Sequence, residues 1–491
     1  MTLVTRRLLS LSIFFAIAGA GGLLLYWQER HSQDAAEAKK TADKLFGFTK
    51  VDDVVGLSLV TPAGSFEIAR QAGAAPDLAW RLTRPQGALA EKMTVEALLG
   101  QLASLSRSRE VGEKLADGSV KPPTDLSIFA LDPPRIVVTV TLADGSREAL
   151  HVGKKSSFDG SLFVTVPGKD GVAVVDGALE YQVNKDLTAL REKRLAIFDT
   201  AEVSALQARY RSIAKPGRTE VYRVDVDVDA DRYTLRAPIE APADGTQISG
   251  LLSSLATVRA KSFAAEEATA AALHTVGLDH PDAEVELTLK DKTSLRLAFA
   301  EQKQGNATVC YAVNRAGGPV LELGSSAVLG KIRTDVEDLR DRRVLHFDRA
   351  AVKKIRMQKG ETTLAFEERH DDEENTSDWF MTAPAEHKVS DATLSGLLYQ
   401  LGNLKGDAVL ADAATDAEWA DAGLEPPELS IELAAADGAG LATLLGGAED
   451  KRGRAAAAKG SRRIFHVPSS ALQDISFTVT DYDAPAAKEL P

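Results

Sequence analysis

The sequence predicts an α+β fold, in which three tandem copies of an antiparallel-sheet-plus-helix domain follow an N-terminal transmembrane helix. Two observations carry this prediction. A long uncharged apolar segment lies near the N-terminus of the 491-residue chain. The remainder repeats one succession of helix, turn and strand patterns three times, at intervals close to 147 residues, and such self-similarity indicates duplicated structural units. An interval this long is typical of whole domains rather than of solenoid repeats.

The apolar segment runs from Leu8 to Trp27 and contains no charged residue. A helix of this length spans about 30 Å, which matches the hydrocarbon core of a bilayer. Arg6 and Arg7 precede it, so the positive-inside rule leaves residues 1–7 in the cytoplasm and exports the bulk of the chain. Ala16-Ile17-Ala18 fits a signal-peptidase site as the alternative, but the apolar run continues beyond it and favours an uncleaved anchor. We expect residues 28–48 to form a solvated juxtamembrane spacer.

The first repeated pattern is that of a helix buried along one face. Apolar residues recur at offsets of 3, 4, 7 and 10 from the first member, which is the stripe of an amphipathic helix. An aromatic residue followed by proline lies ahead of each stripe, at Trp80 and Pro85, Tyr233 and Pro238, and Trp379 and Pro384. The three stripes are Val95, Leu98, Leu99, Leu102 and Leu105; Ile248, Leu251, Leu252, Leu255 and Val258; and Leu394, Leu397, Leu398, Leu401 and Leu404.

A second pattern follows each helix, where a leucine, an acidic residue and a proline lead into an alternating strand. Proline cannot continue a helix, so the chain must turn there. Gly277 and Gly423 precede the leucine in two copies and can end a short helix in the left-handed conformation, where the first copy has Ala130. Alternation in the strands indicates a sheet with one buried face. The turns are Leu131-Asp132-Pro133-Pro134, Leu278-Asp279-His280-Pro281 and Leu424-Glu425-Pro426-Pro427.

These patterns predict domains at residues 49–198, 199–347 and 348–482, followed by a C-terminal tail at 483–491. A basic motif closes the first two copies: residues 190–195 read LREKRL and residues 339–344 read LRDRRV. Phe-Asp follows each motif. The third copy lacks the motif, and a terminal copy has no successor to contact. The motif therefore predicts packing between repeats, with a binding function as the less favoured alternative.

Composition excludes some functions, and the sequence shows no catalytic signature. A net charge of −13 argues against nucleic acid as a partner, and a single cysteine, Cys310, excludes an intramolecular disulfide. No hydrolase, nucleotide-binding or zinc-protease motif is present. We predict no catalytic, cofactor-binding or metal-binding residues, and no cofactor.

Four features resemble sites but favour structural roles. His274 and His280 are close in sequence, yet a turn separates them. Asp225, Asp227, Asp229 and Asp231 alternate with valines as a half-buried strand does, and an EF-hand would need Gly and Glu where Ala230 and Arg236 stand. Residues 367–374 are an acidic run that we expect in a solvated hairpin loop, with weak cation or basic-partner binding as the alternative. Cys310 lies in a strand-like run and is expected to be buried and unreactive.

The combination of anchor, repeats and junction motif resembles the bacterial DUF4340 family, whose function is unknown. The matching residues are the N-terminal anchor, Trp80 with Pro85, the helix at 95–105, Leu131-Asp132-Pro133, and Leu190-Arg191 with Arg194. The likeness covers nearly the whole exported chain, in three copies. Members are often encoded beside gliding-motility-type ABC transporter components, so the resemblance implies an accessory role in the bacterial envelope. It brings no catalytic residues with it.

We therefore expect a non-enzymatic scaffold or accessory protein of the bacterial inner membrane, with its N-terminus in the cytoplasm and its bulk in the periplasm. Its partners would be the inner membrane, through Leu8–Trp27, and an envelope protein such as an ABC transporter component. Two other classes stay open. One is a periplasmic hydrolase or polymer-modifying enzyme, which would need polar groups converging in a groove; the other is a solute-binding accessory subunit.

Overall fold

The computed structural model describes residues 43–116, 120–371, 376–473 and 475–483. The predicted cytoplasmic tail, the anchor at residues 8–27 and most of the spacer lie outside the described residues, as does most of the C-terminal tail. Within the described ranges, no helix is both long enough and apolar enough to cross a membrane.

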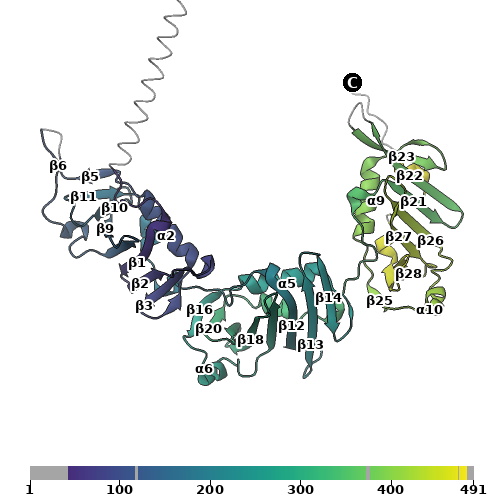
Figure 1. Cartoon of the computed structure of the whole chain (residues 1–491), viewed down its shortest axis with the longest axis horizontal. Coiled ribbons are helices and arrows are strands. Elements are labelled where there is room, and N and C mark those ends of the chain that lie inside the picture. The colour runs from purple at the N-terminus through teal and green to yellow at the C-terminus, as the bar shows by residue number, and fades with distance from the viewer. Residues whose placement is uncertain (1–42, 117–119, 372–375, 474, 484–491) are drawn as a thin grey trace, which may run out of the picture. The chain divides into compact units, whose positions relative to one another are not determined.

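Three nine-stranded sheets with the same strand order form the body of the protein (Figure 1). The first sheet contains β1 (Val54–Thr61), β2 (Gly64–Arg70), β3 (Trp80–Arg84), β4 (Ala88–Leu89), β5 (Arg109–Val111), β8 (Ile136–Leu142), β9 (Arg147–Lys155), β10 (Leu162–Thr165) and β11 (Val172–Val175). The second contains β12 (Val203–Arg211), β13 (Thr219–Asp227), β14 (Arg232–Ala237), β15 (Ala241–Pro242), β16 (Ala260–Ala265), β17 (Ala283–Leu289), β18 (Ser294–Gln304), β19 (Ala307–Asn314) and β20 (Val320–Leu323). The third contains β21 (Lys354–Lys359), β22 (Thr362–Asp371), β23 (Thr376–Ala383), β24 (His387–Lys388), β25 (Ala408–Ala411), β26 (Leu429–Ala434), β27 (Gly440–Gly446), β28 (Gly453–Ala458) and β29 (Ile464–Pro468).

One topology explains all three sheets. In the first, the order is β4-β3-β2-β1-β8-β9-β10-β11-β5, and every neighbouring pair is antiparallel. The chain builds one half of the sheet, crosses with a helix to place β5 at the far edge, and then fills the other half. A separate two-strand ribbon, β6 (Glu113–Lys114) with β7 (Val120–Lys121), follows β5.

The crossing helices are α2 (Lys92–Ser104), α5 (Gly245–Thr257) and α9 (Asp391–Gly402). The first four members of each predicted stripe are buried in these helices, which confirms the periodicity. The fifth member lies just past the helix in each copy, at Leu105, Val258 and Leu404, because the helix ends there and the chain extends. Each helix covers one face of its sheet (Figure 1).

Shorter helices lie at the turns and at the ends of the repeats. They are α3 (Leu179–Val183), α4 (Leu187–Leu190), α6 (Ala270–Thr275), α7 (Ala327–Ile332), α8 (Val336–Leu339), α10 (Asp416–Asp421) and α11 (Ser469–Leu472), with single 3-10 turns at Val51–Asp53, Pro76–Leu78, Ser127–Phe129, Thr200–Glu202, Arg349–Ala351 and Val479–Tyr482. The Phe-Asp pair after each basic motif has a structural role, because Asp199 and Asp348 cap the 3-10 turns just before the first strands of the second and third sheets.

The described end of the predicted spacer is part of the first domain. Leu45, Phe46 and Phe48 are buried in the first core, and the Leu45 N–H donates to the Leu105 carbonyl over 3.0 Å. Arg107 also binds the Asp43 carboxylate at 2.8 Å. The prediction of a solvated spacer is therefore wrong for these residues, because a short apolar cluster in a polar segment can bury itself in a neighbouring core.

The left-handed residues expected before the Leu-acid turns are present in all three copies. The backbone φ is +74° at Gly277, +66° at Gly423 and +56° at Ala130. An L-residue in this conformation costs about 1–2 kcal/mol relative to glycine. The first copy thus folds the same turn with a less suitable residue.

Replacing Ala130 by glycine is expected to stabilise the first repeat by about 0.5–1 kcal/mol, because relief of the left-handed strain exceeds the added freedom of the unfolded chain. The matched change Gly277→Ala should destabilise the second repeat by about 1 kcal/mol. Thermal unfolding, with hydrogen exchange to assign the affected repeat, measures both. A loss of stability in the Ala130→Gly variant would contradict this account of the turn.

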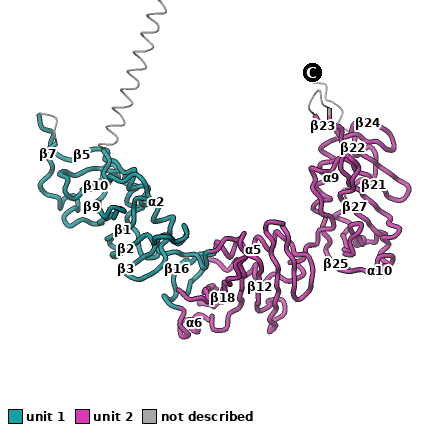
Figure 2. The backbone as a smooth tube through the Cα atoms, in the orientation of Figure 1, with its two compact units in different colours: residues 1–197, 258–267, 319–324 teal, residues 198–257, 268–318, 325–491 magenta. Residues whose placement is uncertain are grey.

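The chain divides into two compact units (Figure 2). The first takes in the described residues up to 197 together with 258–267 and 319–324, and the second takes in the others. The strands β16 and β20 are therefore grouped with the first repeat, so the compact units do not coincide with the sequence repeats.

Candidate interaction sites

The basic motif at residues 190–195 is held by hydrogen bonds on both sides. The Glu91 N–H donates to the Leu190 carbonyl at 2.8 Å, and the Glu192 N–H donates to Leu89 at 2.9 Å. Further along, the Leu195 N–H donates to Val258 at 3.1 Å. The motif thus joins the helix entrance of the first repeat to the segment that leads into β16, which confirms the prediction of packing between repeats.

The motif at residues 339–344 makes the same connections between the second and third repeats. The Asp244 N–H donates to the Leu339 carbonyl at 2.8 Å, and the Val344 N–H donates to Leu404 at 2.9 Å. Copy three ends on a related bond, because the Ser390 N–H donates to the Tyr482 carbonyl at 2.8 Å. Asp483 then stands where the two junctions have arginine.

Side-chain ion pairs recur at both junctions. Arg191 binds Glu266 at 2.7 Å and lies 3.9 Å from the centre of the Phe263 ring, and Arg340 binds Asp412 at 2.5 Å. Both arginine side chains are almost fully buried.

A second cation pairs with the acidic residue at the entrance of each crossing helix. Arg259 binds Glu91 at the first junction, and Lys405 binds Asp244 at 2.9 Å at the second. These basic side chains, which in the sequence could suggest a ligand-binding site, therefore pair with carboxylates of the same chain.

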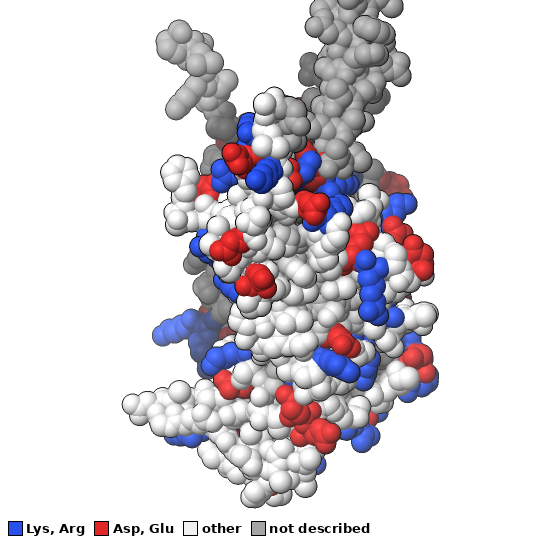
Figure 3. Space-filling model, turned by 90° about the vertical axis from the view of Figure 1, so that its left-hand side faces the viewer, with Lys and Arg blue, Asp and Glu red and all other residues white. Residues whose placement is uncertain are grey.

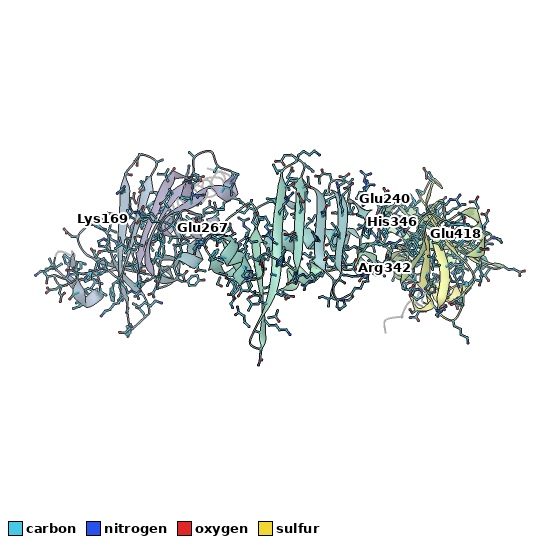
Figure 4. The ribbon with its side chains drawn as sticks, turned by 90° about the horizontal axis from the view of Figure 1, so that it is seen from below. Lys169, Glu240, Glu267, Arg342, His346 and Glu418 are labelled. Atoms are coloured by element: carbon cyan, nitrogen blue, oxygen red, sulfur yellow. The ribbon has the colours of Figure 1, made fainter. Side chains whose placement is uncertain are left out.

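Asp341 is the most buried carboxylate of the second junction, with 3 % of its surface exposed. Its Oδ1 accepts from the Arg343 N–H at 2.9 Å, and its Oδ2 lies 2.8 Å from His346 Nε2. Burial by itself raises the pKa of Asp341, but the hydrogen bonds from His346 and Arg343 outweigh burial and hold the pKa well below its usual range. Figure 4 labels Glu240, Arg342 and His346 around this junction.

The sheet face opposite each crossing helix is open, and in the third repeat it carries a groove of about 710 Å³. Its floor is formed by outward residues of β21, β26 and β27, including Gln358, Glu432 and Leu445. One wall is α10 with the Leu424–Pro427 turn, where Trp419 packs in a small core with Leu424 and Ile464. The other wall is the turn from Lys459 to Arg462. Polar, charged and apolar groups therefore meet in one hollow.

A groove of about 460 Å³ lies at the equivalent place on the second repeat. Arg315 corresponds to Lys459, since each donates its N–H to the matching position of the neighbouring strand, Arg296 at 2.8 Å and Thr443 at 2.9 Å. Ion pairs line this groove, Arg296 with Glu286 at 3.1 Å and Arg315 with Glu284 at 3.0 Å. The groove therefore recurs at the same place in both repeats, but the side chains that line it differ. Charges of both signs are also interspersed on the face shown in Figure 3.

The structure does not turn the histidine pair into a metal site. His274 Nδ1 lies 2.6 Å from Asp279 Oδ2, and within the described ranges no group of three or more His, Cys, Asp or Glu side chains could hold a metal ion. Cys310 is buried, and burial raises the pKa of its thiol to about 12, which keeps it protonated.

Two predictions about acidic segments need correction. The strand through Asp225 and Asp227 ends at Asp227, and Asp229 and Asp231 lie in the turn before β14, where Asp231 has φ of +45°. The acidic run was expected in a hairpin loop, but its residues 367–371 belong to β22 and pair with β23; residues 372–374 lie outside the described ranges. Cross-strand cations such as Lys354, 3.1 Å from Glu367, allow these carboxylates to stand in a strand.

Neither groove could be predicted from a sequence motif, because the residues that line each groove come from segments up to about 100 positions apart. With the fold in place, the class of protein is clear: a tandem array of three homologous α+β domains, each with one helix-covered and one open sheet face.

The chain belongs to the DUF4340 family, a domain of unknown function whose profile matches residues 80–232, 234–378 and 379–486. This confirms the resemblance and the triplication. Each matched segment begins in the third or corresponding strand of one sheet, so it does not coincide with one folded repeat. No curated protein matches the chain. Among solved structures, the DnaN sliding clamp of Pseudomonas aeruginosa bound to griselimycin is 9 % identical over 87 % of this chain and 94 % of the clamp, with a TM-score of 0.13.

Proposed function

We propose that this protein is a non-enzymatic scaffold, held at the bacterial inner membrane by residues 8–27, that binds an envelope protein partner on the open faces of its periplasmic repeats. The partner is a component of an ABC-transporter-type system, as the family resemblance implies. The recurrence of a groove at one place in two repeats, with different side chains, is the observation that carries the proposal. A duplicated surface with varied chemistry suits binding to different parts of a large partner.

The third-repeat groove is the better candidate for the principal contact. Within the part of the chain that the structure describes, its carboxylates Glu425, Glu428 and Glu432 form no ion pair, and Lys459 is the lysine of the lining. Arg462 and Asp416 pair with each other at 2.6 Å. The proline wall and Leu445 supply apolar area beside these charges. A cationic segment with apolar side chains would complement this groove, since electrostatic complementarity provides specificity and apolar burial provides affinity.

A photo-crosslinking amino acid in place of Gln358 tests the proposal in native membranes. Gln358 is exposed on the groove floor, so we expect one main adduct, identified by mass spectrometry as an ABC transporter subunit or another envelope protein. The same amino acid in place of Tyr399 is the control, because Tyr399 is exposed on α9, on the opposite side of the sheet. Glu432→Lys should weaken the Gln358 adduct several-fold. Equal adducts from both positions, or none from Gln358, would contradict the proposal.

The volume of the same groove favours a second candidate, a solute-binding accessory subunit. Ligand pockets commonly occupy about 300–1,000 Å³, and the groove lies within that range. A ligand-dependent rise in the thermal unfolding temperature that Glu432→Lys abolishes would support this function instead.

A further inference from the structure

The turn between β9 and β10 presents the most exposed large apolar side chain of the described residues. Phe158 is 95 % exposed. The turn is well defined: the Ser156 N–H donates to the Ser161 carbonyl at 2.7 Å, and the Gly160 N–H donates to Ser156 at 3.0 Å. Asp159 accepts from the Ser161 hydroxyl at 2.6 Å. A hydrogen-bonded turn thus holds an aromatic ring in water, and transfer of this ring to an apolar environment would be favourable.

Lysines and a second aromatic residue accompany Phe158. Lys154 and Lys155 are exposed at the start of the turn. Lys155 binds Glu180 at 3.0 Å, which brings the neighbouring Tyr181, 77 % exposed, to the same end of the repeat. The Tyr181 ring also lies 4.0 Å from Lys185 Nζ. We call Lys154, Lys155, Phe158 and Tyr181 the turn patch.

Ion pairs connect the turn patch to the point where the described chain begins. Asp159 binds Arg109 at 3.2 Å, and Arg107, two residues earlier, binds Asp43 at 2.8 Å. Residues 28–42 are the only ones between Asp43 and the apolar segment that ends at Trp27. Fifteen residues reach at most about 50 Å when fully extended. If the apolar segment anchors the chain, the patch is tethered close to the bilayer.

We propose that the turn patch rests on the surface of an anionic lipid bilayer, with Phe158 in the interface and Lys154 at the headgroups. This inference rests on the proposed anchor at residues 8–27. Aromatic rings and lysines are the side chains that settle at a membrane interface, because each combines an apolar body with a polar or charged end. A convex turn with one phenylalanine offers too little area for a stable protein–protein interface. The contact would orient the first repeat relative to the membrane.

The test uses the full chain reconstituted into vesicles of phosphatidylethanolamine and phosphatidylglycerol. Ser157→Cys places an environment-sensitive fluorophore beside Phe158, and Cys310 stays unlabelled because it is buried. We expect the emission of the label to shift to the blue on the vesicles. Nitroxide lipids in the vesicles should reduce its fluorescence at least several-fold, compared with vesicles that lack nitroxide. Phe158→Ala in the same background should remove most of the quenching, and Lys154→Gln should reduce it only on anionic vesicles.

Ala214→Cys is the matched control, since Ala214 lies in the β12–β13 turn of the second repeat beside Ile213, which is 72 % exposed, and Lys215. Its label should remain in water. If the protein floats with the vesicles but the Ser157→Cys label still reports a water environment, the patch contact is overturned and the anchor stands. Equal quenching of both labels would overturn the assignment to this patch. Failure of the chain to float would instead overturn the anchor on which the inference rests.

Discussion

Replacing Asp341 by alanine is expected to destabilise the junction of the second and third repeats by about 3–5 kcal/mol, the cost of removing one partner from a buried charge cluster. The carboxylate is almost fully buried and satisfies donors from Arg343 and His346. Without it, Arg343 loses its charged partner and the Arg343 N–H loses its acceptor. Hydrogen exchange at Val344 and Gly406, whose N–H groups cross the junction, measures the loss directly.

Asp338→Ala is the matched control, because Asp338 lies three residues earlier, is largely exposed and meets Arg342 at 3.5 Å. An exposed pair of this kind contributes less than about 1 kcal/mol. Equal losses of stability in the two variants would show that the burial of Asp341 does not determine the stability of the junction.

The same carboxylate should make the junction sensitive to acid. Because the folded-state pKa of Asp341 is depressed, its contribution is fully present above the unfolded pKa near 4 and is lost as the pH falls through the folded-state value. Glu192 at the first junction behaves alike: burial raises its pKa, and the hydrogen bonds from Arg194 lower it further than burial raises it. Asp341→Asn should therefore narrow the difference in unfolding temperature between pH 7 and pH 3.

Trp80→Ala is expected to destabilise the first repeat by about 3–5 kcal/mol, because it removes a large side chain that has no exposed surface. Trp80 packs in one core with the buried face of α2, and Arg70 lies 4.5 Å from the centre of its ring. Hydrogen exchange of the α2 amides should rise sharply, whereas that of the α9 amides should not change.

Trp80→Tyr is the informative companion variant, since Tyr233 takes this position in the second copy and is also buried. In all three copies, the aromatic residue's carbonyl accepts a hydrogen bond from the chain just before the crossing helix, at Ala90, Ala243 and Val389. We expect the tyrosine to recover at least half of the stability that alanine loses. A tyrosine variant as unstable as the alanine variant would mean that the repeats are not equivalent here.

The sequence predicted those parts of the fold that depend on local periodicity. The stripe through Val95 and its two counterparts placed the crossing helices, since one buried helix face imposes a period of 3.6 on the residues themselves. Gly277 and Gly423 marked left-handed turns for the same kind of local reason. The spacer boundary failed because the burial of Leu45 and Phe46 depends on a core formed by residues far along the chain.

The triplication of one α+β unit could be predicted from the amino-acid sequence, because repeated spacing is a property of the chain alone. The roles of the charged side chains, in contrast, depend on the three-dimensional arrangement of the strands. Arg340 and Asp412 are 72 positions apart, and Gln358 and Lys459 line one groove from different strands, so their roles follow from strand order rather than from spacing. The exposure of Phe158 is likewise set by the turn that holds it, since a phenylalanine in a sequence is equally consistent with a core.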